Sequence, residues 1–314
     1  METIPELDFH DFAHGDSASK EFFVQELKNA LSNIGFFALK NHGIPVQLIR
    51  DAYSQCDLFF DLPVDEKLPY AQPQLHHQRG YTPFGTEHAK DQIAPDLKEF
   101  WQTGLPTIDG LHTTFPENIW PDDTVPNFKH VIDGLYSKML NLSVDLLKAC
   151  SLALGKDEQW LPEMTHLGNT IMRLIHYPPL GDDVPQGAVR SAAHEDINFI
   201  TLLVTATADG LEVMDHDGSW IQVQGNEEYI IVDTGDMIQN MTNGFFRSTT
   251  HRVVNPSDGS TRRYSMPMFV HPRNEIDLSP LPEFVEMTGG EVQYPSITAG
   301  DFLYQRLKEI GLAS

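Results

Sequence analysis

Cysteine and positive charge are both scarce in this chain of 314 residues. It has two cysteines and no Cys-x-x-Cys pair, which is too few for a disulfide framework. Lys and Arg number 21 against 45 Asp and Glu, and the formal net charge of −24 argues against nucleic acid or an anionic membrane surface as a partner. No apolar run approaches the length of a membrane span. We therefore expect a protein of the reducing cytoplasm.

Several motifs of common enzyme classes are also missing. The chain has no Gly-x-Gly-x-x-Gly or Walker-type loop, which leaves nucleotide chemistry without support, and no Gly-x-Ser-x-Gly elbow for serine hydrolysis. The N-terminus lacks a basic region followed by an apolar stretch, so we expect no secretory signal. The hydrophobic content of 40% is enough for a sizeable core. We expect a monomer.

One short motif, with a distant histidine, carries three side chains suited to a metal. His194-Glu195-Asp196 is followed far downstream by His251. Two imidazoles and one carboxylate leave coordination positions open, as in non-haem Fe(II) oxygenases. On an extended strand His194 and Asp196 project to the same face, and His251 lies in a second β-prone run that the fold must bring close. The alternative is an ordinary surface ion pair.

Similar short motifs elsewhere have simpler interpretations. A second His-x-Asp at 14–16 and the paired histidines at 76–77 both lie in polar stretches that favour solvated loops. The Asp-His-Asp run at 215–217 could bind a cation, but the glycine that follows it indicates a hairpin turn. We do not expect a site at any of the three.

A third signal, Arg263-Tyr264-Ser265, lies in a run that is typical of a strand. Arg263 and Ser265 then share one face. A planar guanidinium beside a hydroxyl is well suited to a carboxylate, which it can hold by several hydrogen bonds. The alternative is an exposed basic edge strand, on which Arg262 and Arg263 would only deter edge pairing.

Hydrophobic periodicity divides the chain into a helical first half and a strand-rich second half. Apolar residues at helical spacing predict helices over 19–34, 45–61 and 127–154. Residues 70–126 are rich in proline, glycine and polar residues, which is typical of a lid or binding loop. From residue 168 onward we expect short strands over 169–177, 199–206, 211–215, 220–223, 229–232, 237–240, 248–254 and 263–270, and then a helix over 300–312.

This order of elements predicts an α+β fold with a mainly β core. About eight short strands separated by turns suggest a jelly roll or a barrel, and we expect the jelly roll, also called a double-stranded β-helix. We expect a single domain over residues 1–314. Its parts would be a mostly helical N-terminal part over 1–165, the jelly-roll core with the metal site over 166–275, and a C-terminal extension with a capping helix over 276–314.

The motifs, taken together, resemble one known family. His194-x-Asp196, His251 and Arg263-x-Ser265 are similar in kind and order to those of the isopenicillin-N-synthase-like branch of the Fe(II)/2-oxoglutarate-dependent dioxygenases. Further segments also resemble that family. They are residues 4–8, 27–45, 79–81, 96–99, 173, 177–178, 200–203, 235–236 and 243–244.

The resemblance implies a function and a set of site residues. The function would be that of a mononuclear non-haem oxygenase that uses Fe(II), 2-oxoglutarate and dioxygen. It would hydroxylate, desaturate or cyclise a small organic substrate and release succinate and CO2. The residues implied for binding Fe(II) are His194, Asp196 and His251. Those implied for binding the distal carboxylate of 2-oxoglutarate are Arg263, Ser265 and Tyr177. One position departs from many plant-type members, which carry Asn where this chain has Ile175.

Other functions fit parts of the same pattern. In isopenicillin N synthase the matching Arg and Ser hold a substrate carboxylate, so an oxidase that does not use 2-oxoglutarate is one alternative. A jelly-roll binding protein that has lost catalysis is a second, and a zinc hydrolase with the same ligands is a third. The sequence does not specify the substrate. Apolar residues near the motifs could line a pocket but are better explained as core: Phe84, Phe199, Phe245, Phe246 and Met268.

Overall fold

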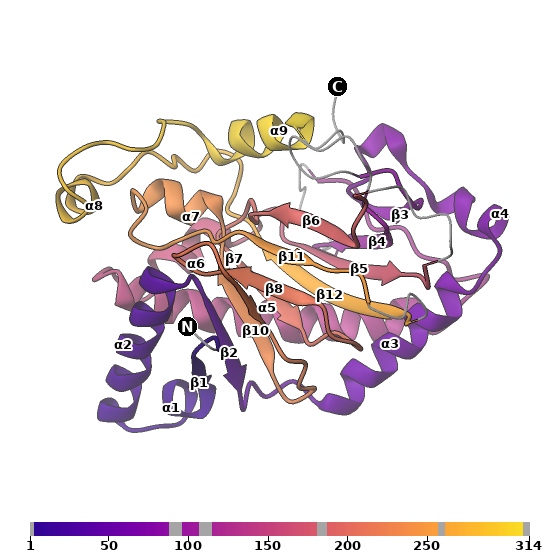
Figure 1. Ribbon diagram of the computed structural model, residues 1–314, viewed down its shortest axis with the longest axis horizontal. Helices are drawn as coiled ribbons and strands as arrows, with labels where there is room; N and C mark the ends of the chain where they lie inside the picture. The colour runs from indigo at the N-terminus through magenta and orange to yellow at the C-terminus, as the bar shows by residue number, and fades with distance from the viewer. Residues whose placement is uncertain (1–2, 88–95, 107–114, 181–186, 257–260, 310–314) are drawn as a thin grey trace.

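Two β-sheets form the centre of the molecule (Figure 1). The computed structural model describes residues 3–87, 96–106, 115–180, 187–256 and 261–309. The strands of the large sheet are β1 (Glu6–Asp8), β2 (Phe36–Lys40), β3 (Gly80–Thr82), β4 (Glu99–Gly104), β5 (Ile171–Tyr177), β7 (Ile200–Val204), β10 (Ile230–Thr234) and β12 (Arg263–Val270). The strands of the small sheet are β6 (Ser191–His194), β8 (Leu211–Met214), β9 (Trp220–Gln222) and β11 (His251–Val253).

Strands β10, β7, β12 and β5 lie at the centre of the large sheet. The order of all its strands is β1-β2-β10-β7-β12-β5-β4-β3, and the order in the small sheet is β6-β11-β8-β9. Neighbouring strands are antiparallel except β1 and β2, which are parallel. Strand β12 therefore lies in the interior of the large sheet, and β6 lies at an edge of the small one.

Helices surround the sheets at both ends of the chain (Figure 1). They are α1 (Phe9–Ala13), α2 (Ser17–Asn33), α3 (Val46–Phe60), α4 (Val64–Lys67), α5 (Phe128–Ala153), α6 (Trp160–Thr165), α7 (Asp236–Met241), α8 (Pro282–Met287) and α9 (Ala299–Glu309), with 3-10 turns η1 (Leu68–Tyr70) and η2 (Pro73–Leu75). Helix α5 packs against α2, α3 and the strands β7 and β12. Among the described residues, no helix is both long and apolar enough to cross a membrane.

The two faces of β12 have different roles. Because successive side chains of a strand point to opposite faces, every second residue can join the hydrophobic core while the others face away from it. The core residues of β12 are Tyr264, Met266, Met268 and Val270. The residues between them line a cavity that residues of the small sheet also line: Arg263, Ser265, Pro267 and Phe269.

The expected α+β architecture with a mainly β core and helices at both ends is confirmed. The helices predicted over 19–34, 45–61 and 127–154 correspond to α2, α3 and α5. The helix predicted over 300–312 corresponds to α9, and residues 310–312 lie outside the described part of the chain.

Two local predictions are wrong. Residues 237–240 belong to helix α7 and not to a strand. Met237, Ile238 and Met241 are all buried, and in so short an apolar run the hydrophobic pattern does not distinguish a helix from a strand. The second correction concerns the irregular lid expected over 70–126. That segment contains β3 and β4, all of whose residues are buried.

Candidate active site

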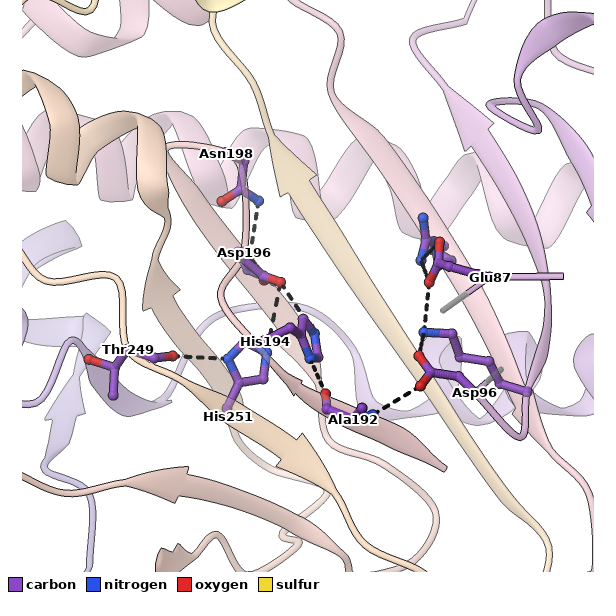
Figure 2. A network of polar contacts seen from close by, with 11 residues as sticks. Glu87, Asp96, Ala192, His194, Asp196, Asn198, Thr249 and His251 are labelled. Atoms are coloured by element: carbon purple, nitrogen blue, oxygen red, sulfur yellow. Dashed lines mark hydrogen bonds and ion pairs between the residues drawn. The ribbon is translucent and has the colours of Figure 1, made fainter. Parts of the chain in front are cut away.

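Three potential metal ligands meet beside the cavity between the sheets (Figure 2). His194 ends β6 and His251 begins β11, and the two residues are partners in the antiparallel register. Asp196 lies two residues beyond the end of β6, so the motif is extended only in part. Its Oδ1 atom is 3.9 Å from Nε2 of His194 and 3.8 Å from Nε2 of His251. The structure thus brings together the three residues that the motif predicts.

Backbone carbonyls fix the tautomer of both imidazoles. Nδ1 of His194 lies 2.7 Å from the carbonyl oxygen of Ala192, and Nδ1 of His251 lies 3.1 Å from that of Thr249. A carbonyl can only accept a hydrogen bond, so each Nδ1 carries the proton and each Nε2 keeps the lone pair that a metal requires. Burial, together with the nearby His251, lowers the pKa of His194 and favours its neutral form.

The carboxylate of Asp196 is oriented through its other oxygen. Oδ2 accepts a hydrogen bond from the Thr201 hydroxyl, and that hydroxyl accepts one of 2.9 Å from the amide of Asn198. The backbone oxygen of Asp196 accepts a bond of 2.7 Å from the N–H of Asp236. Oδ1 therefore remains directed at the imidazoles. Two neutral imidazole nitrogens and one carboxylate oxygen are a donor set that suits Fe(II) and leaves further positions open.

The guanidinium of Arg263 is buried, and one of its nitrogen atoms has no hydrogen-bond partner in the described part of the chain. The residue is 1% exposed, and β12 is an interior strand, so the alternative of an exposed basic edge strand is excluded. Nε donates to the carbonyl of Ala208 at 3.0 Å, whereas the buried Nη1 has no hydrogen-bond partner among the described residues. Tyr177 is the cross-strand partner of Arg263, and Ser265 lines the same cavity. A carboxylate placed here would satisfy the buried donor.

One cavity connects Arg263 with the three potential ligands. Its volume is about 390 Å³, which is typical of small-molecule sites. Alternate residues of β5 and β12 line it, and they run from Tyr177 and Arg263 at one end to Ile171 and His271 at the other. Helix α9 also contributes to the lining, where Arg306 forms an ion pair of 3.0 Å with Asp236. The cavity extends well past Arg263 and so offers more room than one carboxylate needs.

A chain of buried charges forms part of the cavity wall beside His194 (Figure 2). Nζ of Lys98 lies 2.7 Å from Glu87 and 2.8 Å from Asp96, and Nη1 of Arg173 lies 3.0 Å from Glu87. The sequence motifs assign no role to these residues. The resemblance already included residues 96–99 and 173, and the opposite charges of Asp96 and Lys98, just before the buried strand β4, are the signal that could have pointed to a buried ion pair.

Glu87 provides a prediction for acid stability. Burial would raise its pKa, but Arg173 and Lys98 outweigh burial and lower the pKa from 4.5 to about 2. Because the folded-state pKa is depressed, this carboxylate stabilises the fold above its usual pKa, and the contribution is lost as the pH falls from 4.5 to about 2. Glu87→Gln should therefore lower the free energy of unfolding by roughly 3 kcal/mol at neutral pH.

Urea unfolding of wild type and Glu87→Gln at a series of pH values checks this prediction. The difference between the two proteins should shrink as the pH falls through the same window. A difference that is independent of pH would show that the Glu87 carboxylate is not stabilised by Arg173 and Lys98.

The other sequence candidates have structural roles. Phe199, Phe246 and Met268 are core residues, Phe245 packs against the core and Phe84 is exposed, and none of the five lines the cavity. The His-x-Asp at 14–16 forms the turn between α1 and α2, and the run at 215–217 lies in the hairpin turn between β8 and β9, as expected. In the loop at 76–77, His76 is exposed and His77 is half-buried, and His76 lines the cavity, which a merely solvated loop did not predict.

Two family models match the sequence. The model described as non-haem dioxygenase in morphine synthesis N-terminal matches residues 4–123, and the model of the 2OG-Fe(II) oxygenase superfamily matches residues 168–272. The second match contains the three potential metal ligands as well as Tyr177, Arg263 and Ser265.

Similar proteins match almost the whole chain. A 2-oxoglutarate-Fe(II) type oxidoreductase of Metarhizium rileyi is 32% identical, with 96% of this chain and 89% of the relative covered. A proline hydroxylase of Petromyces alliaceus is 31% identical, with 97% and 98% covered. A solved Neurospora crassa structure, in complex with alpha-KG and thymine, has a TM-score of 0.86 and 28% identity, with 97% and 96% covered.

The chain belongs to the 2OG-Fe(II) oxygenase superfamily, and its N-terminal match fits the isopenicillin-N-synthase-like branch. It is an oxidoreductase, a dioxygenase that uses Fe(II), 2-oxoglutarate and dioxygen and acts on a small molecule. The expected jelly-roll fold and the expected use of 2-oxoglutarate are both confirmed. These relatives do not support two of the alternatives that the sequence left open, an oxidase that works without 2-oxoglutarate and a binding protein that has lost catalysis.

Proposed function

We propose that His194, Asp196 and His251 hold the iron of this oxygenase. The observation that carries the proposal is the orientation of the three ligand atoms. Both Nε2 atoms lie within 3.9 Å of one carboxylate oxygen, and both Nδ1 atoms are engaged by backbone carbonyls. Three ligands on one face leave the remaining positions of the metal open for the cosubstrate and dioxygen.

We propose further that Arg263, Ser265 and Tyr177 hold the distal carboxylate of 2-oxoglutarate. Nη1 of Arg263, which has no hydrogen-bond partner in the part of the chain that the structure describes, supports this, because a carboxylate can accept two parallel hydrogen bonds from a guanidinium. Ile175 lies opposite Ser265 in the strand register and also lines the cavity. At this position the cosubstrate would be oriented by packing against an apolar wall and not by an amide.

Fe(II) and 2-oxoglutarate supply the oxidising chemistry when bound, in which dioxygen is consumed, succinate and CO2 are released and a C–H bond of the substrate is oxidised. The protein's own residues position the reactants and exclude water. Thr201 keeps Asp196 in one orientation, and the buried ends of β5 and β12 would enclose the carboxylate of the cosubstrate. We take hydroxylation as the outcome, with desaturation or ring closure as variants on the same site.

The substrate would be a small organic molecule bound at the far end of the cavity. There Gln102, Phe269 and His271 offer polar groups and an aromatic ring. Arg173 lines this region too, but its charge is already paired with Glu87. This part of the wall would therefore bind a substrate through hydrogen bonds and not through an unpaired charge. The names of the relatives mention proline and thymine, and small polar molecules of this kind are the first to test.

The test is a screen of small metabolites and peptides for substrate-dependent succinate formation by the Fe(II)-loaded protein. At least one compound should raise succinate release well above the rate without substrate, and His194→Ala should give none. Oxygen consumption without 2-oxoglutarate would support the oxidase instead. Hydrolysis by the zinc-loaded protein would support a zinc hydrolase, and binding of compounds without any turnover would support a silent binding protein.

We also propose that residues 1–314 form one oxygenase domain that acts as a monomer in the cytoplasm. The part over 1–165 would supply most of the helices, 166–275 the site, and 276–314 the helix beside the cavity. Cys56 and Cys150 are buried free thiols, which suits a reducing compartment. The net charge of −24 suits neither nucleic acid nor an anionic membrane as partner. Light scattering of the purified protein tests the monomer.

A further inference from the structure

Strand β6 carries His194 at the edge of the small sheet. It pairs with β11 alone, and the register between them shifts between His251 and Val253. An edge strand leaves main-chain groups unpaired along its outer side. In β6, the N–H of Ala192 donates to Oδ1 of Asp96 at 3.0 Å, and the carbonyl of Ala192 accepts from Nδ1 of His194 at 2.7 Å (Figure 2). Side chains thus occupy both main-chain groups of Ala192.

Asp96 is held in turn by the large sheet. It is 3% exposed and lies just before β4. Its second oxygen is 2.8 Å from Nζ of Lys98, which also contacts Glu87, and Glu87 pairs with Arg173 of β5. The four charges alternate in sign along the chain of contacts, so each buried group is compensated by its neighbours. The carboxylate of Asp96 is therefore fixed relative to the large sheet.

We propose that Asp96 is a positioning residue for the metal: its carboxylate ties β6 to the large sheet and so sets the place of the His194 imidazole. The inference rests on the proposed role of His194 as an iron ligand. Two hydrogen bonds carry the effect, one from the Ala192 N–H to Asp96 and one from His194 to the Ala192 carbonyl. Without Asp96, β6 keeps its pairing with β11, and the nearby bond of 3.0 Å from the N–H of Leu97 to the carbonyl of Val189 remains, but Ala192 loses the bond that ties it to the carboxylate held by the large sheet.

The expected effect is on metal affinity. Partners that orient a ligand imidazole are worth about 10- to 100-fold in metal affinity. Asp96 acts one hydrogen bond further away, so Asp96→Ala should weaken Fe(II) binding by about 10-fold, at the lower end of that range. Asp96→Asn should have a smaller effect, because the amide oxygen can still accept from the N–H of Ala192.

Glu99 provides a matched control. It begins β4, and its ion pair of 2.9 Å with Lys67 is also buried. It additionally contacts Tyr81 and His176, and within the described part of the chain its hydrogen bonds do not reach β6. Glu99→Gln should therefore lower the free energy of unfolding, as Asp96→Asn also should, without changing the affinity for Fe(II). The measurement is an anaerobic competition between each full-length protein and a coloured Fe(II) chelator, with urea unfolding recorded in parallel.

The inference is supported if both Asp96 variants bind Fe(II) more weakly than wild type while Glu99→Gln binds it normally. It is overturned if folded Asp96→Ala binds Fe(II) like wild type, or if Glu99→Gln weakens binding as much, since the effect would then be one of general stability. Should Asp96→Ala not fold, Asp96→Asn decides by the same comparison. Normal binding by His194→Ala would instead refute the proposed iron site, and the role of Asp96 with it.

Discussion

Replacing His194, Asp196 or His251 with alanine should abolish Fe(II) binding and succinate formation while the protein still folds. Each side chain provides one of the three ligand atoms that lie within 4.8 Å of one another. Groups that only orient a ligand are worth about 10- to 100-fold in metal affinity, so loss of a ligand itself should exceed roughly 100-fold. The measurement is the iron content after anaerobic loading and desalting, together with succinate release.

The second His-x-Asp pair gives a matched control for this prediction. It lies in the turn between α1 and α2, where the Asp16 carboxylate accepts from the backbone N–H of Ser19 and caps α2. Asp16→Ala should lower the free energy of unfolding, as the loss of a helix cap does, and His14→Ala should lower it less. Both should keep the iron content of wild type. An active, iron-replete Asp196→Ala protein would contradict the assignment of the ligands.

Arg263→Ala should weaken the binding of 2-oxoglutarate by roughly 10- to 150-fold without loss of iron. A hydrogen bond to a charged group contributes about 1.5–3 kcal/mol, and this range converts to that loss of affinity. Arg263 is 1% exposed at the end of the cavity, and among the described residues its Nη1 atom has no hydrogen-bond partner, so its charge would be available to the carboxylate. Calorimetric titration of the anaerobic Fe(II) protein with 2-oxoglutarate gives the affinity.

Arg262 is the natural control for Arg263. It is the preceding residue, and its side chain is 37% exposed and forms an ion pair of 2.7 Å with Asp61 on the surface. Arg262→Ala should bind 2-oxoglutarate like wild type, since its side chain does not line the cavity. If Arg263→Ala also titrates like wild type, the carboxylate clamp belongs to the substrate and not to 2-oxoglutarate.

The pair of Arg263 and Ser265 could be predicted because it depends on local geometry, whereas His251 reaches His194 only through the pairing of β11 with β6. Arg263 and Ser265 share one face of β12, as alternation along a strand requires, and both line the cavity. The same alternation would have located more of the site. Continued along β12 it gives Phe269 and then His271, and applied to β5 it gives Arg173, all of which line the cavity.

The remaining features depend on partners that are distant in the sequence. From the sequence alone, a charged residue such as Glu99 is expected at the surface. Its burial depends on the ion pair with Lys67, which is 32 residues away in the sequence. The same holds for Lys98, whose buried ammonium is compensated by Glu87 and Asp96. A composition-based interpretation therefore assigned the segment that contains β4 to an irregular loop, although the strand lies in the interior of the large sheet.

The most direct measurement is an anaerobic crystal structure of the protein with Fe(II) and 2-oxoglutarate, with anomalous scattering recorded at the iron edge. We predict one anomalous peak bonded to Nε2 of His194, Nε2 of His251 and the carboxylate of Asp196, and the distal carboxylate of 2-oxoglutarate on Arg263. Iron bound elsewhere, no iron at these three side chains, or a 2-oxoglutarate carboxylate placed away from Arg263 would contradict the proposed site.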